Sequence, residues 1–142
     1  MSESNDYKTF KDNCPEPLDR IDRIENMVGV GAPDINFCIE GIDRWIELKS
    51  PTEPKRETTP LFGSNHKLSI DQRNWFLRQR NARGRAFILI ATDKRWMLIE
   101  GQYADFINKL PVNGLLKIAI WNATKPIKEK TKWKQLRALL IA

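Results

Sequence analysis

The chain has 142 residues, the usual size of a single domain with one hydrophobic core. Apolar side chains make up 41% of it and charged side chains 30%, a balance typical of folded proteins that excludes a disordered chain. No apolar run approaches the roughly 18 residues of a membrane-spanning helix, and the first residues are too polar for a secretory signal. We therefore expect one domain, residues 1–142, in the cytoplasm.

Charge is distributed unevenly along the chain. Residues 1–50 carry 11 acidic and 6 basic side chains, whereas residues 51–142 carry 7 acidic and 18 basic ones. The basic part suits a polyanion such as DNA or RNA, although a basic solvated surface would give the same count. The two cysteines, Cys14 and Cys38, have neither the spacing of a zinc site nor that of a disulfide framework, so we expect ordinary reduced thiols.

The first elements expected along the chain are a helix and a hairpin. A helix over about residues 17–27 is predicted, with Pro in its first turn and Gly29 and Gly31 ending it. Strands over 34–40 and 43–49 follow, joined by a tight turn around Gly41. Residues 50–68 are rich in Pro, Thr, Ser and Gly, which predicts a long loop, and such loops are often functional.

The second half begins with a helix start signal. Ser69 and Gln72 have the spacing of a capping box, and the helix should run to about residue 83, where Gly84 closes it. The apolar run 86–91 is typical of a strand buried on both faces, and a partner strand is expected over 95–99. A short helix over 102–109, a strand over about 115–121 and a helix from 131 complete the chain.

The hairpin predicts a grouping of charged side chains. If Gly41 and Ile42 form the turn, Asp34 lies opposite Lys49 and Asn36 lies opposite Glu47. Because side chains alternate between the faces of a sheet, these four residues share one face, and the intervening apolar residues form the other. A slip by one residue would mix the two sets, so the clean alternation favours this pairing.

Two carboxylates and an ammonium group at one end of a hairpin suit phosphodiester hydrolysis. A divalent cation held by Asp34 and Glu47 can activate water and stabilise developing charge, and Mg²⁺ needs only one or two protein carboxylates. Lys49 can orient the attacking water or offset charge in the transition state. The alternative is a surface ion pair of Lys49 with either carboxylate, which would contribute little.

Two further residues extend this site. On the expected first helix, Glu25 falls at the edge of the apolar stripe, about 60° from its centre, so it could share the cation; alternatively it reaches solvent or caps a local group. Gln72 could serve only the capping box, point at a metal-bound water or a phosphate, or do both.

At this point the motifs resemble a known family. Three motifs are similar to those of the PD-(D/E)XK nuclease superfamily: GAPD at 31–34, ELK at 47–49 and QRNW at 72–75. They are closest to the motifs of its stand-alone VRR-Nuc type domains, which are often encoded by phages. The segment GRAFILIA at 84–91 resembles the strand that follows in that family. The likeness covers about residues 16–100 and leaves a basic C-terminal extension over about 101–142.

The resemblance implies an α/β fold of the restriction-endonuclease-like type, with an αβββαβ core and a central mixed β-sheet flanked by helices. It implies phosphodiester hydrolysis with Mg²⁺ or Mn²⁺, the metal being held by Asp34, Glu47 and the Leu48 carbonyl. Glu25 would be the acidic residue of the first helix, Lys49 the catalytic lysine and Gln72 the accessory glutamine. By analogy with junction-resolving enzymes, a homodimer is expected.

The function expected from these features is a magnesium-dependent DNA endonuclease directed at branched DNA, such as Holliday junctions, or other non-duplex DNA. The alternatives are an inactive nucleic-acid-binding module and an RNase on the same scaffold. Candidate phosphate contacts on the loop and second helix are His66, Lys67, Arg73, Arg80, Arg83 and Arg85. The C-terminal stretch adds Lys125, Lys128, Lys130, Lys132 and Lys134. A lone His66 suits a phosphate neighbour or a loop residue better than a metal ligand.

Overall fold

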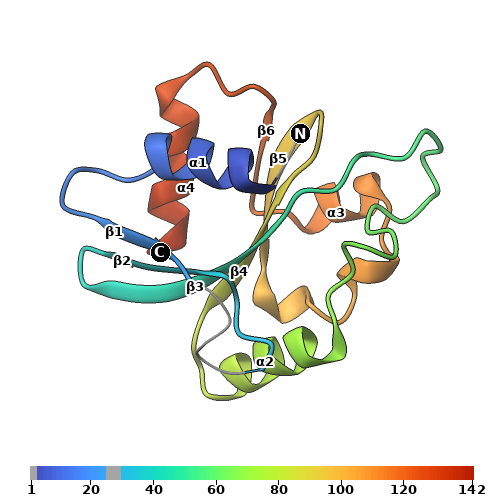
Figure 1. Cartoon of the computed structure of the whole chain (residues 1–142), viewed down its shortest axis with the longest axis horizontal. Helices are drawn as coiled ribbons and strands as arrows, with labels where there is room; N and C mark the ends of the chain where they lie inside the picture. The colour runs from blue at the N-terminus through green and yellow to red at the C-terminus, as the bar shows by residue number, and fades with distance from the viewer. Residues whose placement is uncertain (1–2, 25–29) are drawn as a thin grey trace.

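The structure is a computed structural model of the chain, and it describes residues 3–24 and 30–142 (Figure 1). Its elements in chain order are α1 (Glu3–Asn13), β1 (Arg20–Arg23), β2 (Ile35–Ile39), β3 (Ile42–Lys49), α2 (Ile70–Asn81), β4 (Ala86–Ala91), β5 (Arg95–Glu100), η1 (Gly101–Tyr103), η2 (Ile107–Lys109), α3 (Val112–Ile118), β6 (Trp121–Thr124) and α4 (Lys130–Leu140).

The described strands form one six-stranded sheet in the order β1-β2-β3-β4-β5-β6. β3 and β4 run parallel, and every other neighbouring pair is antiparallel. Parallel neighbours require a crossover connection, and here the loop after β3 together with α2 provides it. The succession α1-β1-β2-β3-α2-β4 confirms the expected αβββαβ core with a mixed sheet flanked by helices.

Helices cover both faces of this sheet (Figure 1). Phe10 of α1 and Trp133 of α4 pack on one face in a cluster that includes Ile46. Phe76 of α2 packs on the other face in a second cluster, together with the helix α3. All six residues of β4 are buried, as expected for a strand covered on both faces. Within residues 3–24 and 30–142, none of the helices has the length and apolar character that crossing a bilayer requires.

The hairpin of β2 and β3 has the predicted faces but a different register. Its turn residues are Glu40 and Gly41, both with positive φ, and Ile39 pairs with Ile42. The pairing is shifted by two residues from the predicted one, so Asn36 lies opposite Trp45. Positive φ at both central positions is typical of the type I′ turn, whose twist matches that of the strands. Because the shift is by two, each side chain stays on its predicted face.

The prediction of a helix over residues 17–27 is wrong for residues 17–24, the part of that range that the structure describes. Arg20–Arg23 forms the edge strand β1, in which only Ile21 is buried, and Leu18 is fully exposed. The first helix is instead α1, which sequence analysis missed. Its apolar contribution is small, chiefly Tyr7 and Phe10, so it has too few apolar residues to show a helical period.

Three expectations for the second half need correction. The strand expected over 115–121 is wrong, because the chain forms α3 with Pro111 at its N-cap, and β6 begins only at Trp121. Short apolar runs fit a helix or a strand equally well. The helix expected over 102–109 consists of the two short 3₁₀ turns, η1 and η2. The helix α2 ends with Ala82 as its C-cap, and Arg83 rather than Gly84 adopts a positive φ.

The predicted capping box of α2 is confirmed. The Ser69 hydroxyl accepts a hydrogen bond from the Gln72 amide at 3.1 Å, and the Gln72 side chain accepts one from the Ser69 amide at 2.9 Å. Ser69→Ala should therefore lower the free energy of unfolding by about 1 kcal/mol. Thermal unfolding should show a decrease in Tm of roughly 3 °C, whereas Ser64→Ala in the exposed loop should change it by less than about 1 °C. Equal Tm values for the two variants would contradict this role of Ser69.

Candidate functional site

The site lies at Asp34, the residue just before β2 begins, where β3 continues beyond its pairing with β2. The β2–β3 pairing begins at Ile35 opposite Ile46, so the last residues of β3 have no partner in β2. Instead of a backbone group of β2, the Asp34 side chain accepts the hydrogen bond from the Leu48 amide, at 3.0 Å. Because the amide and carbonyl of one strand residue point to the same edge, the Leu48 carbonyl is directed to the side of Asp34. The Ile24 amide donates to the Asp34 carbonyl at 2.6 Å and fixes that backbone.

Glu47, Lys49 and Gln72 converge beside this pair. Glu47 is only 5% exposed, and its Oε2 lies 3.5 Å from Nζ of Lys49. Nε2 of Gln72 donates to the same oxygen at 3.2 Å, while Oε1 of Gln72 accepts from the Ser69 amide. Gln72 thus caps α2 and also holds Glu47, so its role extends beyond the capping box. The predicted grouping of Asp34, Glu47 and Lys49 at one end of the hairpin is present.

Both carboxyl groups are costly to ionise in the protein without metal. Burial raises the pKa of Asp34 above its ordinary value, and the nearby Glu3 adds to this, although the hydrogen bond from Leu48 opposes it. Burial also raises the pKa of Glu47, with Asp34 as the second cause, and Lys49 only partly opposes the shift. A structural ion pair would hold the carboxylate pKa low. Lys49 lowers the pKa of Glu47, but by less than burial and Asp34 raise it, so the ion pair with Lys49 does not offset the cost of ionising Glu47.

The first helix contributes an acidic residue that sequence analysis missed. Glu3 in the first turn of α1 interacts with the Asp34 carboxyl and also acts on Glu47. Arg23 at the end of β1 holds Glu3 with a 3.0 Å ion pair and lies 5.4 Å from the centre of the Tyr7 ring. Glu25, which the sequence suggests for this role, lies outside the described residues.

The donor set fits a small divalent cation. Among the described residues, no three His, Cys, Asp or Glu side chains converge as a metal-binding group. Asp34 and Glu47 nevertheless supply two carboxylates, and the Leu48 carbonyl supplies a third oxygen on the same side. Mg²⁺ is usually bound through one or two carboxylates and keeps several waters. The positive charge of a cation would also stabilise both ionised carboxylates and so offset the burial and repulsion that raise their pKa values.

The raised pKa values predict how the stability of the metal-free protein depends on pH. The folded state binds protons at Asp34 and Glu47 more tightly than the unfolded chain, whose carboxyl groups titrate near pH 4. This contribution to stability is complete below about pH 4 and is lost as the pH rises through the raised values. Urea unfolding in EDTA should show the wild type losing stability between pH 5 and 8 relative to Glu47→Gln. Parallel pH profiles for the two proteins would contradict the shift at Glu47.

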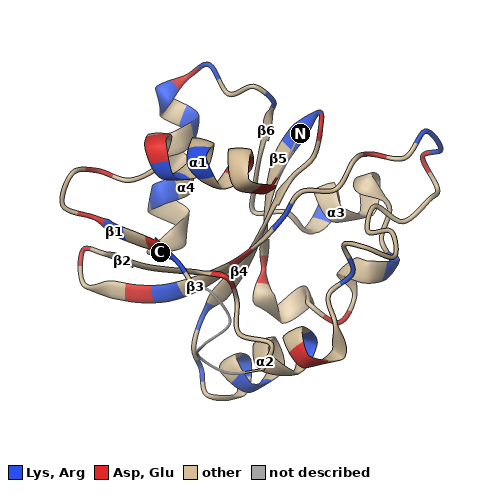
Figure 2. Ribbon diagram, viewed as in Figure 1, with Lys and Arg blue, Asp and Glu red and all other residues tan. Residues whose placement is uncertain are grey.

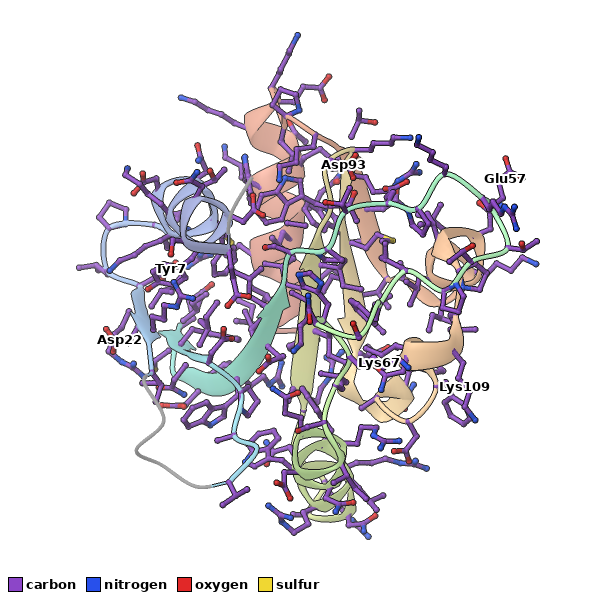
Figure 3. The ribbon with its side chains drawn as sticks, turned by 45° about the vertical axis from the view of Figure 1, so that its right-hand side comes forward. Tyr7, Asp22, Glu57, Lys67, Asp93 and Lys109 are labelled. Carbon is purple, nitrogen blue, oxygen red and sulfur yellow. The ribbon has the colours of Figure 1, made fainter. Side chains whose placement is uncertain are left out.

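The predicted phosphate contacts near α2 fall into two kinds. His66 and Arg73 are partly buried, and Nε of Arg73 is buried without a hydrogen-bond partner. Arg80 and Arg83 are exposed at the end of α2, and Figure 3 labels Lys67 in the segment leading into that helix. Figure 2 shows further basic residues along α2. α2 and the loop before it lie on the sheet face that carries Glu47.

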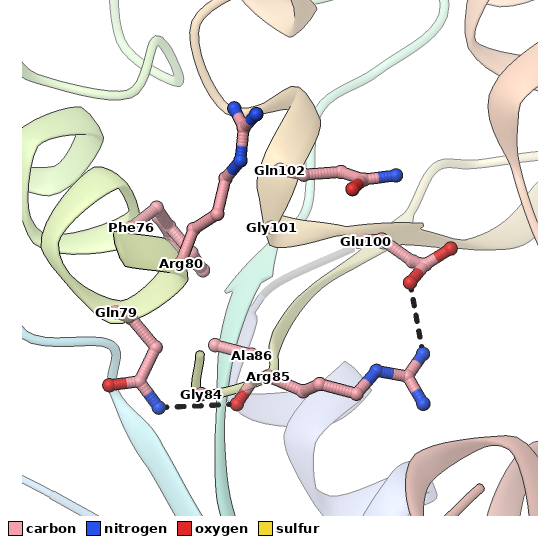
Figure 4. A pocket seen from close by; sticks show the side chains of 9 residues that line it. All are labelled: Phe76, Gln79, Arg80, Gly84, Arg85, Ala86, Glu100, Gly101 and Gln102. Carbon is pink, nitrogen blue, oxygen red and sulfur yellow. Dashed lines mark hydrogen bonds and ion pairs between the residues drawn. The ribbon is translucent and has the colours of Figure 1, made fainter. Parts of the chain in front are cut away.

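The Arg85 side chain is held by contacts within the protein (Figure 4). Its guanidinium pairs with Glu100 at 2.9 Å and lies 5.0 Å from the centre of the Phe87 ring. Together with Gln79 and Arg80 it lines a small pocket of about 70 Å³ between α2 and the sheet. The guanidinium therefore contributes to local structure as well as to the basic surface.

The C-terminal lysines are divided between structural and solvent-exposed positions. Lys125 pairs with the buried Asp6 at 2.7 Å, and Lys132 donates to the Asn122 carbonyl at 3.2 Å. Lys128, Lys130 and Lys134 are exposed. Since α4 packs on the sheet face opposite α2, the structure does not bring the α4 lysines together with the arginines of α2.

Comparison with known proteins finds a similar solved structure but no matching sequence family. Neither a protein-family model nor a curated protein sequence matches the chain. Hjc from Archaeoglobus fulgidus, a Holliday junction resolvase from an archaeal hyperthermophile, has a similar structure with a TM-score of 0.51 and 16% sequence identity. The match covers 81% of this chain and 88% of that one. At this identity the likeness shows the fold, so the chain has the mixed α/β fold that the sequence motifs predicted.

Proposed function

We propose that the protein is a metal-dependent endonuclease that hydrolyses phosphodiester bonds in DNA. The observation that carries this proposal is the pair of the half-buried Asp34 and the buried Glu47, two carboxyl groups with raised pKa values beside the Leu48 carbonyl and Lys49. A folded protein keeps such a pair against its cost when the pair has a ligand to bind. The grouping of oxygen ligands with one ammonium group is the set that phosphodiester hydrolysis requires.

Each residue of the site has a distinct task in this proposal. A bound Mg²⁺ or Mn²⁺ would supply a nucleophilic water near neutral pH and would offset charge on the phosphate oxygens. Asp34, Glu47 and the Leu48 carbonyl would hold the ion. Lys49 would orient the attacking water and stabilise negative charge that develops in the transition state. Gln72 keeps the Glu47 carboxylate in a fixed orientation through its 3.2 Å hydrogen bond.

Branched or otherwise non-duplex DNA is the proposed substrate. Two observations support it, namely the basic residues of α2 and its preceding loop on the face of the site, and the structural likeness to a Holliday junction resolvase. Basic side chains contact the phosphate backbone of any nucleic acid, so they supply affinity rather than selectivity. We also propose a homodimer, because a junction presents two equivalent strands; sedimentation equilibrium measures this directly.

The experiment is a cleavage panel with purified protein and Mg²⁺. Four-way junction, flapped, single-stranded and duplex DNA of matched length are compared with structured RNA, in parallel with EDTA and with Mn²⁺. We expect cleavage of the junction or flap that depends on the metal. Absence of cleavage on every DNA with either metal would contradict the proposal, and salt-sensitive binding without turnover would then favour an inactive binding module. Cleavage confined to RNA would favour the RNase.

A further inference from the structure

A pair of tryptophans lies directly beside the candidate site. Trp45 of β3 and Trp75 of α2 meet edge to face, with ring centroids 6.1 Å apart and an interplanar angle of 62°. Both are partly exposed, whereas Trp96, Trp121 and Trp133 are at most 5% exposed in the cluster on the opposite sheet face. Trp75 also meets the buried Phe76 edge to face, with ring centroids 5.5 Å apart, and edge-to-face contacts leave ring faces that the neighbouring rings do not cover.

The tryptophan pair bridges β3 and α2 next to the place where Glu47 and Gln72 bridge them. Trp45 precedes Glu47 by two residues, so the two side chains share a face of β3 about 7 Å apart along the strand. Trp75 follows Gln72 by three residues, which places it on a neighbouring position one turn along α2. Since Gln72 and Glu47 are joined by a hydrogen bond, the aromatic pair is the next layer along the same interface. It is therefore continuous with the proposed site.

Trp45 packs against the apolar cluster of Phe76 and has a polar neighbour across the hairpin. Asn36 lies opposite Trp45 in the hairpin, and its side chain is hydrogen-bonded to Arg20 at 2.7 Å and to Asp43 at 2.9 Å. Arg20 also pairs with the exposed Asp22 at 2.6 Å, on the edge strand that Figure 3 shows at the margin of the sheet. Because Asp22 and Asp43 both pair with Arg20, its guanidinium is already neutralised and attracts phosphate little, so an aromatic ring here suits a base better than the backbone.

We propose that the Trp45–Trp75 pair stacks an unpaired nucleobase of the DNA strand held at the site. The inference rests on the proposed function, which it deepens by naming the structural feature of the substrate that is recognised. Every base has a stacking face, so aromatic side chains bind single strands with little sequence preference. In a duplex the bases stack on one another, and exposing one costs free energy. The pair thus favours junctions, flaps and single strands over duplex DNA.

The test measures binding without catalysis, in EDTA, so that it is independent of cleavage. Single-stranded and duplex oligonucleotides of equal length are titrated into the wild type, and intrinsic tryptophan fluorescence is followed. We expect single strands to quench the emission strongly and duplex DNA to quench it weakly. Because the other three tryptophans are buried on the far face, the quenching reports on Trp45 and Trp75.

Two variants at one position separate stacking from packing. Trp75→Leu keeps apolar bulk without an aromatic face, and Trp75→Phe keeps a smaller aromatic face. We expect Trp75→Leu to weaken single-strand binding roughly tenfold and Trp75→Phe to weaken it less, with duplex affinity changed by less than about twofold. The absence of quenching in the wild type, or an equal loss of affinity for both DNA forms, would overturn the inference. Quenching without cleavage in Mg²⁺ would support it while contradicting the proposed nuclease.

Discussion

Glu47→Gln is expected to abolish DNA cleavage while leaving the metal-free protein at least as stable as the wild type. The substitution removes the carboxylate that we propose binds the metal, and with it the partner of Lys49, so several kcal/mol of transition-state stabilisation should be lost, which is about a thousandfold or more in rate. Burial and the proximity of Asp34 make the ionised Glu47 costly to fold. A neutral amide of the same shape removes this cost. Single-turnover cleavage and thermal unfolding in EDTA measure the two effects.

A second buried glutamate provides the matched control. The Glu53 side chain is 6% exposed and accepts two hydrogen bonds from the Arg95 guanidinium, at 2.7 and 3.1 Å. Glu53→Gln breaks a well-formed ion pair, so it should lower the free energy of unfolding by about 2 kcal/mol. Cleavage per folded molecule should change little, because Glu53 has no contact with the site. If Glu47→Gln destabilised the metal-free protein as Glu53→Gln does, Glu47 would be a structural partner of Lys49.

Gly31→Ala should destabilise the protein more than the same substitution at Gly41 or Gly63. Gly31 has a φ of +82°, and a methyl group on it would lie 2.2 Å from the Asp71 carbonyl oxygen and 2.8 Å from the Gln72 amide nitrogen. The segment leading to Asp34 therefore packs directly on the first turn of α2. Backbone strain and steric overlap together should cost about 3 kcal/mol, a decrease in Tm of roughly 10 °C. Cleavage should fall as well, because Asp34 and Gln72 are displaced from each other.

Gly41→Ala separates the two causes. Gly41 has almost the same φ, +81°, but no atom lies within 4 Å of an added methyl group. This variant meets only the backbone strain, so it should cost about 1 kcal/mol and leave cleavage unchanged. Gly63→Ala, which also has open space, should have almost no effect. Equal losses for the variants at 31 and 41 would show that the close approach to α2 does not matter.

The sequence predicted the grouping of Asp34, Glu47 and Lys49 better than the elements around it. Alternation of apolar and polar residues predicted which side chains of β2 and β3 lie on each face. This prediction is correct despite a two-residue error in register, because a shift by an even number of residues leaves every side chain on the same face. The capping residues Ser69 and Gln72 were equally clear, since their hydrogen bonds are local. The long apolar run of β4 could be identified because burial on both faces requires it.

The errors share a physical origin in short elements fixed by distant contacts. Ile21 and Leu18 have helical spacing, yet pairing with β2 makes β1 a strand and leaves Leu18 in solvent. The helix α1 is polar along most of its length and is held by Phe10 in the core and by the pair of Glu3 with Arg23. Neither contact has a signature in the local sequence. The sequence therefore points to Glu25 as the acid of the first helix, whereas in the structure Glu3 of α1 is the acidic residue beside Asp34.

The central claim is that Asp34, Glu47 and the Leu48 carbonyl hold one divalent cation. A crystal structure of the protein with Mn²⁺ tests it most directly, because the anomalous signal of manganese locates the ion independently of the protein atoms. The claim predicts one strong peak about 2.0–2.3 Å from oxygens of all three groups. A strong peak elsewhere, or none at this position when Mn²⁺ is in excess, would contradict it.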